Sequence, residues 1–500
     1  MLRRSFLRTT GSLTAALTVP EALLADPYRD VRFTRDFAVG TLTRIRGRVH
    51  AGGRGVAGVG ITDGVTTVTT DRDGRYTLLA APGARFVSVR LPRGFGVPVQ
   101  QTGTAQLHQA ILPDQRGEAE ASFTIERLPV NDARHAFLLL ADPQTENALE
   151  IGRLHAETVP DIQGTVSALR DRNVFGIACG DIMFDDLTLY PEYERAVTAT
   201  RVPFFQVVGN HDLDFAGRTD ETSVATFESR FGRGYYSFDR GEVHYVVLDD
   251  VLWFGSDYVG YLDGGQLAWL AGDLALVERG RTVVVFLHIP LASTRPERVG
   301  GAKAGPGERV QNPEALYRLL EPYKVHILSG HTHENEHVLT GAVHEHIHGT
   351  VCGAWWSGDI CWDGTPNGYG VWEVNGGELR WRYKATGQSA DHRLRVYPRG
   401  ADPTAPTDLV ANVWDWDPAC TVVWYEGADR RGELSRRIGL DPLSVRLHTG
   451  PTLPSRRAWV EPTPTGHLFY TAGPETTGEL RVEVTDRWGQ VAVATASTAH

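Results

Sequence analysis

The stretch ILSGHTHENE, residues 327–336, ends an apolar run at a glycine and then places His331 and His333 two positions apart. Side chains alternate between the two faces of an extended strand, so histidines with this spacing point the same way and one metal ion can bind both. Two solvated loop histidines would give the same short pattern. The rest of the chain therefore has to decide between a metal site and a surface loop.

Similar apolar runs recur between residues 131 and 383 and alternate with amphipathic segments such as 264–279 and 312–322. Continuous apolar runs are typical of strands buried on both faces of a sheet, and the segments between them have helical spacing. We therefore expect an α/β layered domain here. The six runs are HAFLLLAD, VFGIACGD, FFQVVGNHD, VHYVVLDD, TVVVFLHIP and VHILSGHTH.

Five of the six runs end in side chains that can coordinate a metal ion. In chain order these are Asp142 and Gln144, Asp181, Asn210 and His211, His288, and His331 with His333. An Asp or Asn after a glycine is common in turns, so each motif alone is weak. Ligands bind beyond the carboxyl ends of strands in α/β sheets, and an ordered set at successive strand ends is hard to obtain from turn chemistry alone. The sequence thus predicts a metal centre at one edge of the sheet.

The order of these motifs resembles the calcineurin-like metallophosphoesterase family, whose blocks read D-x-H, G-D-x-x, G-N-H-[DE], a later His, and G-H-x-H. The resemblance covers residues 135 to about 384 and implies a β-sandwich flanked by helices, with two metal ions at one edge. The whole chain is similar to a branch of the family with a DPQ first block, an N-terminal immunoglobulin-like or transthyretin-like domain and a C-terminal β-domain. An α/β core with an all-β domain on each side is the expected fold class.

The resemblance also implies which residues bind the metals. One ion is held by Asp142, Gln144, Asp181 and His333, and the second by Asp181, Asn210, His288 and His331. Two divalent ions about 3.5–4 Å apart can share a hydroxide that attacks the phosphorus of a phosphate mono- or diester. Oxygen and imidazole ligands without thiolate suit Mn²⁺, Fe²⁺ or Zn²⁺.

In this scheme His211 is not a ligand but lies beside the second ion, where it protonates the leaving oxygen or stabilises the developing charge, with Asp212 orienting its ring. Two departures from the family pattern matter. Gln144 replaces the more frequent histidine, which predicts weaker binding of the first ion. Phe184 stands where purple acid phosphatases place a tyrosinate, and its lack of an oxygen argues against a ferric site.

Both flanks of the α/β region show the rhythm of short strands and turns. Residues 40–115 and the chain after 386 each predict a small β-sandwich, and the proline-rich linker 397–408 is typical of a domain boundary. The expected domains are a signal peptide at 1–25, an immunoglobulin-like or transthyretin-like β-sandwich at 26–118, the catalytic domain at 119–386 and a C-terminal β-domain at 387–500.

The N-terminus carries twin arginines, Arg3 and Arg4, before a mildly apolar stretch that is interrupted by Pro20 and Glu21. This resembles a twin-arginine export signal, and we expect a periplasmic or extracellular protein with no transmembrane segment. Of the four cysteines, Cys352 and Cys361 are close enough in sequence to form a disulfide, with buried thiols as the alternative.

Substrate contacts are predicted in two loops. The loop at 292–310 carries Arg295, Arg298 and Arg309, because arginine matches phosphate geometry, although a solvated loop has the same composition. The segment at 354–369 carries Trp355, Trp356 and Asn367, whose aromatic members would stack a ring or pack in the core. A third metal site at His344, His346 and His348 is the alternative to a half-exposed strand face.

The composition is that of a soluble globular protein, with 41% hydrophobic and 22% charged residues and a formal net charge of −11. The negative charge argues against a nucleic-acid polymer as partner. We expect an exported metal-dependent phosphoesterase with a phosphoester substrate. Two alternatives remain: a non-catalytic wall- or glycan-binding protein that keeps the fold, and a metal-dependent amidase.

Overall fold

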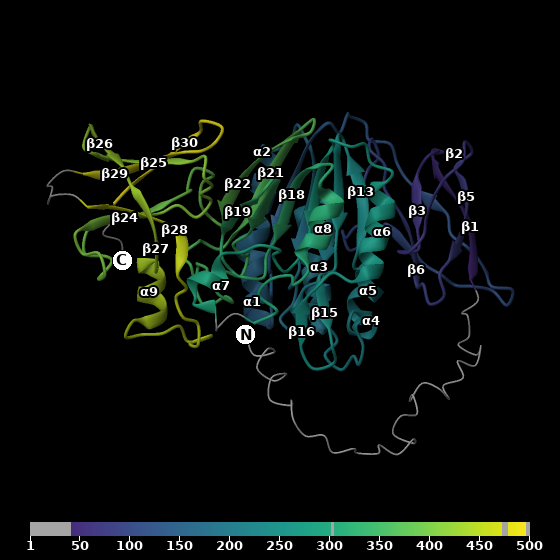
Figure 1. The fold of residues 1–500 in the computed structure, drawn as a ribbon, viewed down its shortest axis with the longest axis horizontal. Coiled ribbons are helices and arrows are strands. Elements are labelled where there is room, and N and C mark those ends of the chain that lie inside the picture. The colour runs from purple at the N-terminus through teal and green to yellow at the C-terminus, as the bar shows by residue number, and fades with distance from the viewer. Residues whose placement is uncertain (1–41, 302–304, 473–478, 497–500) are drawn as a thin grey trace, which may run out of the picture. The chain divides into compact units, whose positions relative to one another are not determined.

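The computed structural model describes residues 42–301, 305–472 and 479–496 (Figure 1). The predicted signal peptide at 1–25 lies outside the described residues. All elements discussed below belong to the compact unit Thr43–His500. No helix in the described ranges is both long enough and apolar enough to cross a membrane.

Two β-sheets form the centre of the fold. The five-stranded sheet has the order β12-β11-β10-β21-β22, and the six-stranded sheet has the order β13-β14-β17-β18-β20-β19. The strands of the first are β10 (Arg134–Leu140), β11 (Asn173–Cys179), β12 (Phe204–Val207), β21 (Gly368–Asn375) and β22 (Glu378–Ala385). Those of the second are β13 (Tyr236–Arg240), β14 (Val243–Val247), β17 (Thr282–Phe286), β18 (Lys324–Ser329), β19 (Glu336–Thr340) and β20 (Val343–Ile347).

The strand pairings explain why the apolar runs carry metal-binding residues at their ends. β10, β11 and β12 are parallel neighbours, and so are β14, β17, β18 and β20. Parallel strands end at the same edge of a sheet, and ligands of such sheets bind beyond their carboxyl ends. The predicted α/β core is confirmed, and its candidate site lies where these strands end.

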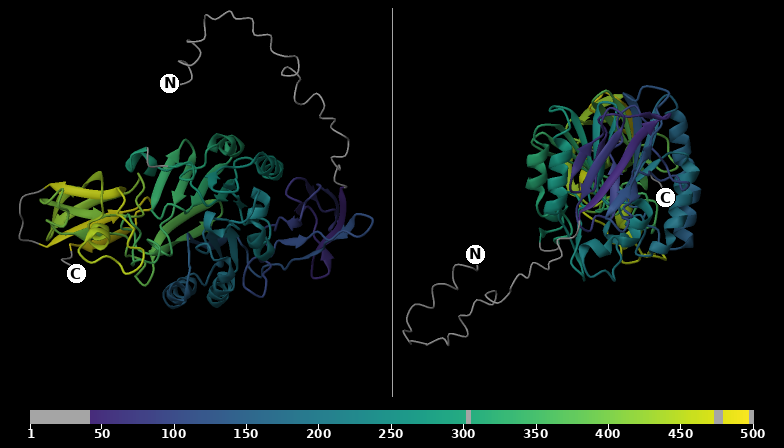
Figure 2. Two further views of the ribbon diagram at one scale, coloured as in Figure 1. Left: turned by 90° about the horizontal axis from the view of Figure 1, so that it is seen from below. Right: turned by 90° about the vertical axis from the view of Figure 1, so that its right-hand side faces the viewer.

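Each central strand is buried on both faces, as its sequence predicts. Phe137 and Leu139 of β10 belong to the core between the sheets, whereas Leu138 and Leu140 face the core beneath the helices. Helices lie on both outer sides of the strands (Figure 2). The helical elements of the central module include α1 (Ala148–Arg153), η2 (Leu154–Thr158), α2 (Val159–Ala168), α3 (Tyr190–Thr200), α4 (Asp220–Ser223), α5 (Ala225–Phe231), α6 (Gly264–Leu274), α7 (Arg295–Arg298) and α8 (Pro313–Leu320). The hairpin of β15 (Val251–Trp253) and β16 (Tyr258–Gly260) precedes α6.

The N-terminal module contains two small sheets. Its strands are β1 (Thr43–Ala51), β2 (Arg54–Gly55), β3 (Gly60–Thr62), β4 (Thr67–Thr69), β5 (Arg75–Ala80), β6 (Phe86–Val89), β7 (His108–Ala110), β8 (Glu118–Glu120) and β9 (Phe123–Thr124). β8 and β9 both pair with β1, so this module extends past the predicted boundary at residue 118. Arg90 reaches from it to Asp239 at 3.0 Å and to Asp273 at 3.4 Å, and both carboxylates also contact His244.

The C-terminal module also contains two four-stranded sheets, β23-β24-β28-β27 and β26-β25-β29-β30. Its elements are β23 (Arg395–Tyr397), β24 (Asp408–Asn412), β25 (Thr421–Glu426), β26 (Asp429–Glu433), β27 (Ser435–Gly439), α9 (Pro442–Thr449), β28 (Thr465–Ala472), β29 (Leu480–Thr485) and β30 (Val491–Thr495). The four cysteines are all free thiols, so the alternative of buried thiols holds and the disulfide between Cys352 and Cys361 is not formed.

Candidate metal centre

The predicted ligands follow the ends of five parallel strands. Asp142 comes after β10, Asp181 after β11, Asn210 after β12, His288 after β17 and His331 after β18. Each strand is hydrogen-bonded to at least one other parallel strand of the same sheet, so the turns that follow converge on one edge. The motif order along the chain is thus converted into a cluster in space.

Three glycines allow this cluster to close. A Cβ on Gly209 would lie 2.0 Å from the Asp181 backbone nitrogen, and a Cβ on Gly330 would lie 2.3 Å from Asp142 Oδ2. A Cβ on Gly180, whose φ is +82°, would lie 2.2 Å from His288 Nδ1. Asp181, Asn210 and His331 are therefore each preceded by a glycine because neighbouring strand ends approach too closely there for a Cβ.

The ligand residues themselves have a strained backbone. Positive φ values are found at Asp142 (45°), Gln144 (40°), Asp181 (47°), His331 (70°) and His333 (52°). Non-glycine residues rarely adopt this region, and each instance costs on the order of 1–3 kcal/mol. Such strain concentrated at one set of polar side chains is typical of a functional site that the surrounding fold holds in place.

Four side chains form the first half of the centre. Nε2 of His288 lies 3.1 Å from Asn210 Oδ1, 3.1 Å from His331 Nδ1 and 3.3 Å from Asp181 Oδ1. The other ring nitrogen of His288, Nδ1, donates to the Cys179 carbonyl at 3.0 Å, which leaves the Nε2 lone pair facing the cluster. The ligand atoms of Asp181, His288 and His331 all lie within 4.8 Å of one another, which suits one metal ion.

The second half shares Asp181 and adds three more side chains. Gln144 lies 3.2 Å from Asp181 Oδ2, and His333 Nε2 lies 3.6 Å from Asp142 Oδ1. Nδ1 of His333 donates to the Gly353 carbonyl at 2.6 Å, so Nε2 is again the free ligand atom. The Gln144 amide turns its nitrogen toward Asp181, and a half-turn about its last bond presents the oxygen that a metal ion would require.

The two buried carboxylates at this site favour the binding of cations. Asp142 and Asp181 are 0% and 2% exposed, and their ion-pair partners among the described residues are histidines. Burial raises the pKa of Asp142 to about 8. Burial lowers the pKa of His288, but the Asp181 carboxylate outweighs it and the net pKa of His288 is raised to about 10. Two carboxylates, an asparagine, a glutamine and three imidazoles fit a pair of divalent ions, which would replace protons as the positive charge.

His211 lies beside this cluster rather than in it. Its backbone nitrogen donates to Asp181 Oδ1 at 2.8 Å, and its ring stacks on Phe184 with centroids 4.5 Å apart. Nδ1 lies 2.6 Å from Asp185 Oδ1, so Nε2 is the nitrogen left to face a substrate. Burial lowers the pKa of His211, but the Asp181 and Asp185 carboxylates outweigh it and the net pKa is raised. The raised pKa favours the protonated ring, and the His211 side chain is 25% exposed.

Asp212 does not orient the His211 ring, contrary to the sequence-based prediction. It is fully buried and accepts hydrogen bonds from the backbone nitrogens of Ile182 at 3.1 Å and Gly209 at 3.0 Å, and from the Tyr190 hydroxyl at 3.1 Å. It fastens the turn after β11 to the turn after β12, and Asp185 takes the predicted place beside the ring. Asp185 was missed because its φ of 68° turns it back toward His211, which no local motif shows.

Arg295 and Arg298 are not free to bind a phosphate. Arg298 pairs with Glu334 and is 4% exposed, and Arg295 pairs with both Glu334 and Glu308. Arg295 also donates to Thr463 Oγ1 of the C-terminal module at 2.6 Å. These arginines neutralise buried Glu334 and fasten the 292–310 loop, so the prediction that they contact substrate is wrong.

The remaining predicted substrate residues differ in role. Arg309 is 39% exposed and pairs with Glu297 at 3.4 Å. Trp356 is buried and donates to the Pro143 carbonyl at 3.1 Å, which makes it a support for the first strand end. Asn367 is buried and donates to the Gly358 carbonyl at 3.3 Å. Neither Trp356 nor Asn367 is placed to meet a substrate.

Trp355 leads outward from the metal centre. Its ring stacks on His333 with centroids 4.1 Å apart at 21°, and Trp459 of the C-terminal module packs on it at 4.7 Å. Trp459 is 56% exposed. In the same segment, the Arg457 guanidinium lies 4.6 Å from the centre of the Phe184 ring and pairs with Glu146 at 2.6 Å. Residues 456–459 thus form a rim against Trp355 and Phe184, the rings that stack on His333 and His211, and nothing local in the sequence indicated it.

Three family models match separate parts of the chain. Residues 136–335 match the model described as calcineurin-like phosphoesterase, residues 43–128 match that for its N terminal and residues 345–491 match that for its C terminal. Purple acid phosphatase 23 of Arabidopsis thaliana is 29% identical over 182 residues, which are 32% of this chain and 37% of that protein. Serine/threonine-protein phosphatase CPPED1 of Rattus norvegicus is 29% identical over 136 residues, 25% of this chain and 43% of that protein.

The chain therefore spans less than half the length of these curated relatives. Among solved structures, a dimetal phosphatase from Danio rerio aligns with 16% identity and a TM-score of 0.34, covering 50% of this chain and 96% of that one. Together the three family models match the central module and both flanking β-modules. The chain belongs to the calcineurin-like phosphoesterase family.

Proposed function

We propose that this chain is an exported, metal-dependent phosphoesterase that hydrolyses a phosphate mono- or diester. The observation that carries the proposal is the convergence of seven oxygen and imidazole ligands from five strand ends, with a histidine that is not a ligand beside them. Binding of two divalent ions there would supply an activated water and neutralise charge on the phosphoryl group. Mn²⁺, Fe²⁺ and Zn²⁺ all suit this ligand set.

The residues of the chain have separate tasks in this scheme. Hydrogen bonds to the Cys179 and Gly353 carbonyls hold His288 and His333 in the tautomers that present Nε2. Asp185 holds His211 through Nδ1, so that Nε2 carries the proton that the leaving oxygen receives. Asp212 keeps the two turns that bear Asp181 and His211 at a fixed separation.

The rim formed by residues 456–459 suggests which leaving groups fit. Trp355 and Trp459, whose rings are tilted at 54° to each other, offer an apolar wall that begins at the candidate ligand His333. Rings pack on such walls by stacking. We therefore infer that the preferred leaving group carries an aromatic or sugar ring.

A metal-reconstitution experiment tests the proposed function. The purified chain, stripped with a chelator and reloaded with Mn²⁺, is expected to hydrolyse aryl phosphate mono- or diesters, and the stripped protein is not. Asp181→Ala and Asn210→Ala should abolish turnover. Metal binding without hydrolysis of any phosphoester would favour the binding-protein alternative, and hydrolysis of amides alone would favour the amidase.

Export rests on the twin arginines of the N-terminus. Cells that express the full chain should contain a shortened form outside the cytoplasm. Replacing Arg3 and Arg4 together by lysine should leave the chain unprocessed in the cytoplasm. Equal export of this variant would refute the twin-arginine route.

A further inference from the structure

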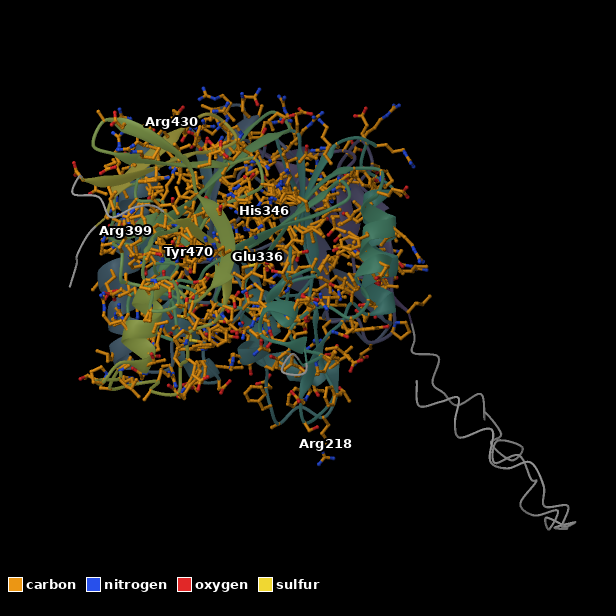
Figure 3. The ribbon with its side chains drawn as sticks, turned by 60° about the vertical axis from the view of Figure 1, so that its left-hand side comes forward. Arg218, Glu336, His346, Arg399, Arg430 and Tyr470 are labelled. Atoms are coloured by element: carbon orange, nitrogen blue, oxygen red, sulfur yellow. The ribbon has the colours of Figure 1, made fainter. Side chains whose placement is uncertain are left out.

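A second group of histidines lies away from the metal centre, on the face of the six-stranded sheet that looks toward the other sheet. In the strand register, His326 of β18 is opposite His344 of β20, and His337 of β19 is opposite His346. His344 and His346 are 6% and 0% exposed, so the expected half-exposed strand face is wrong. Figure 3 shows His346 among densely packed side chains, whereas Arg218 extends from the edge.

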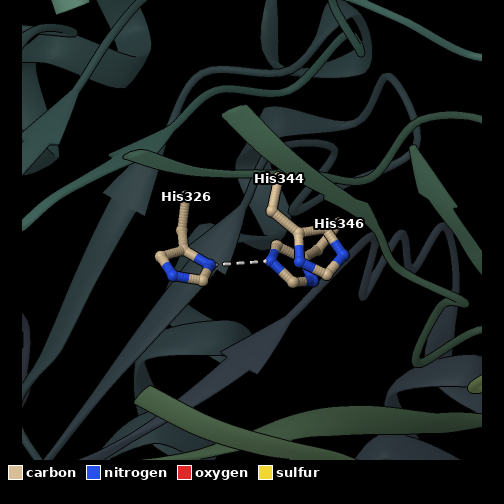
Figure 4. A group of neighbouring side chains, drawn as sticks. All are labelled: His326, His344 and His346. Carbon is tan, nitrogen blue, oxygen red and sulfur yellow. Dashed lines mark hydrogen bonds between the residues drawn. The ribbon is translucent and has the colours of Figure 1, made fainter. Parts of the chain in front are cut away.

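Three of these rings meet closely enough to share an ion. Nδ1 of His326 lies 3.0 Å from Nε2 of His346, and the His344 and His346 rings stack with centroids 3.9 Å apart. One nitrogen from each of His326, His344 and His346 lies within 4.8 Å of the others (Figure 4). Nitrogens bound to one tetrahedral ion are about 3.3 Å apart, since each metal–nitrogen bond is about 2.0–2.1 Å. The separations of 3.0 Å between His326 and His346 and of at most 4.8 Å within the group bracket this value.

The surroundings leave a polar atom without a partner. Nε2 of His344 is buried and has no hydrogen-bond partner among the described residues. The rings instead face Trp372 and Trp381, whose centroids lie 4.7 Å from that of His346. A buried nitrogen without a partner costs on the order of 1–3 kcal/mol, whereas Leu or Val at this face would cost nothing. Nε2 of His344 is thus a buried nitrogen that a bound ion could use as a ligand atom.

A chain of hydrogen bonds prepares one of the three for metal binding. Asp415 of the C-terminal module accepts from Nε2 of His337 at 2.9 Å, so Nδ1 of a neutral His337 can only accept. Nδ1 of His337 lies 3.0 Å from Nδ1 of His346, so the His346 nitrogen must be the donor of this hydrogen bond. Nε2 of His346 is left with its lone pair facing His326. A carboxylate that fixes the tautomer of a ligating histidine is a common feature of metal sites.

We propose that His326, His344 and His346 bind one divalent transition-metal ion of the kind that prefers imidazole, with Zn²⁺ as the probe. This site is separate from the dinuclear centre. Three histidines leave a fourth position open to water, and His326, which is only partly buried, gives access from solvent. The ion would clamp β18 to β20 and, through His337 and Asp415, stabilise the junction with the C-terminal module.

The test counts ions on the full chain. The protein is stripped with a chelator, titrated with Zn²⁺ and analysed by calorimetry and by elemental analysis of the washed complex. Wild type should hold one more tightly bound Zn²⁺ per chain than His344→Ala. The Mn²⁺-dependent phosphoesterase turnover of the two proteins should agree within about twofold. His348→Ala is the matched control: His348 is buried, follows His346 by two residues just past the end of β20, lies outside the group of three, and its replacement should leave the ion bound.

Two further measurements separate metal binding from a structural role. Asp415→Asn should weaken this ion by about 10- to 100-fold without removing it, because it disturbs the histidine tautomer. In an Asp181→Ala background, Co²⁺ should show the visible absorption of a four-coordinate site with three nitrogen ligands and a water. If His344→Ala does not fold, His326→Gln at the partly exposed position replaces it. Equal Zn²⁺ counts in wild type and variant, or no Co²⁺ absorption, would overturn the proposal.

Discussion

Replacing Asp185 by asparagine should slow the protonation of the leaving group while leaving the metal centre intact. The change keeps the shape of the side chain but removes the charge that lies 2.6 Å from His211 Nδ1. A charge-assisted hydrogen bond contributes about 1.5–3 kcal/mol. The Asp185 side chain is 46% exposed, so solvent screening places the effect at the lower end, about 1.5 kcal/mol. This corresponds to a loss of about tenfold in rate.

The assay compares aryl phosphoesters whose leaving groups differ in acidity. An acidic phenol leaves without help, so 4-nitrophenyl substrates should be nearly unaffected, and phenyl or alkyl substrates should lose about tenfold in kcat. His211→Ala sets the upper limit, about 10²- to 10⁴-fold for the poor leaving groups. Asp186→Asn is the matched control, because Asp186 caps the Thr188 nitrogen and does not bond to His211. Equal losses for good and poor leaving groups, or loss of bound metal, would refute the reasoning.

Three other predictions concern the cluster, the rim and the N-terminal junction. Gly330→Ala should displace Asp142, since its Cβ would lie 2.3 Å from Oδ2, and elemental analysis should show lost metal together with lost turnover; Gly272→Ala, which meets nothing within 4 Å, should show neither. Trp459→Ala should raise KM for aryl phosphoesters about three- to tenfold and leave glycerol phosphate unchanged, whereas a uniform change would argue against stacking. The buried His244, held by Asp273 and Asp239, has a raised pKa although burial opposes it. Its stabilising effect is complete below about pH 6.5 and is lost as pH rises through the raised value, at up to about 1.4 kcal/mol per pH unit. Denaturant unfolding across this range should show that slope in wild type, and an equal slope in His244→Gln would contradict the assignment.

The candidate metal centre was accessible to sequence reasoning because its candidate ligands lie in short motifs at strand ends. Each apolar run predicts its own strand, and parallel pairing brings the ends together without further information. The order Asp142, Asp181, Asn210, His288, His331 therefore carried most of the site. The glycines before three of these residues were visible in the same motifs.

Residues whose role depends on a distant partner were misjudged. Arg295 and Arg298 lie in a loop whose composition is typical of phosphate binding, but both form ion pairs with Glu334. These pairs form only when the loop packs against the turn after β18. Asp212 and Asp185 are both close to His211 in the fold, and only backbone direction decides which of them reaches the ring. His326 is visible in the run VHILSGHTH, but its position opposite His344 follows only from the register of β18 and β20, which the sequence does not show.

The rim supplied by residues 456–459 has a consequence for how such proteins diversify. The candidate ligands lie on the central module, whereas Trp459, the exposed half of the proposed wall, lies on the C-terminal module, and contacts such as Arg457 with Glu146 and Trp459 with Trp355 join the two. Substitutions in that C-terminal segment can retune selectivity while the ion-binding turns stay untouched. Grafting residues 456–459 of one homologue onto another would thus transfer the leaving-group preference and leave the proposed hydrolysis unchanged.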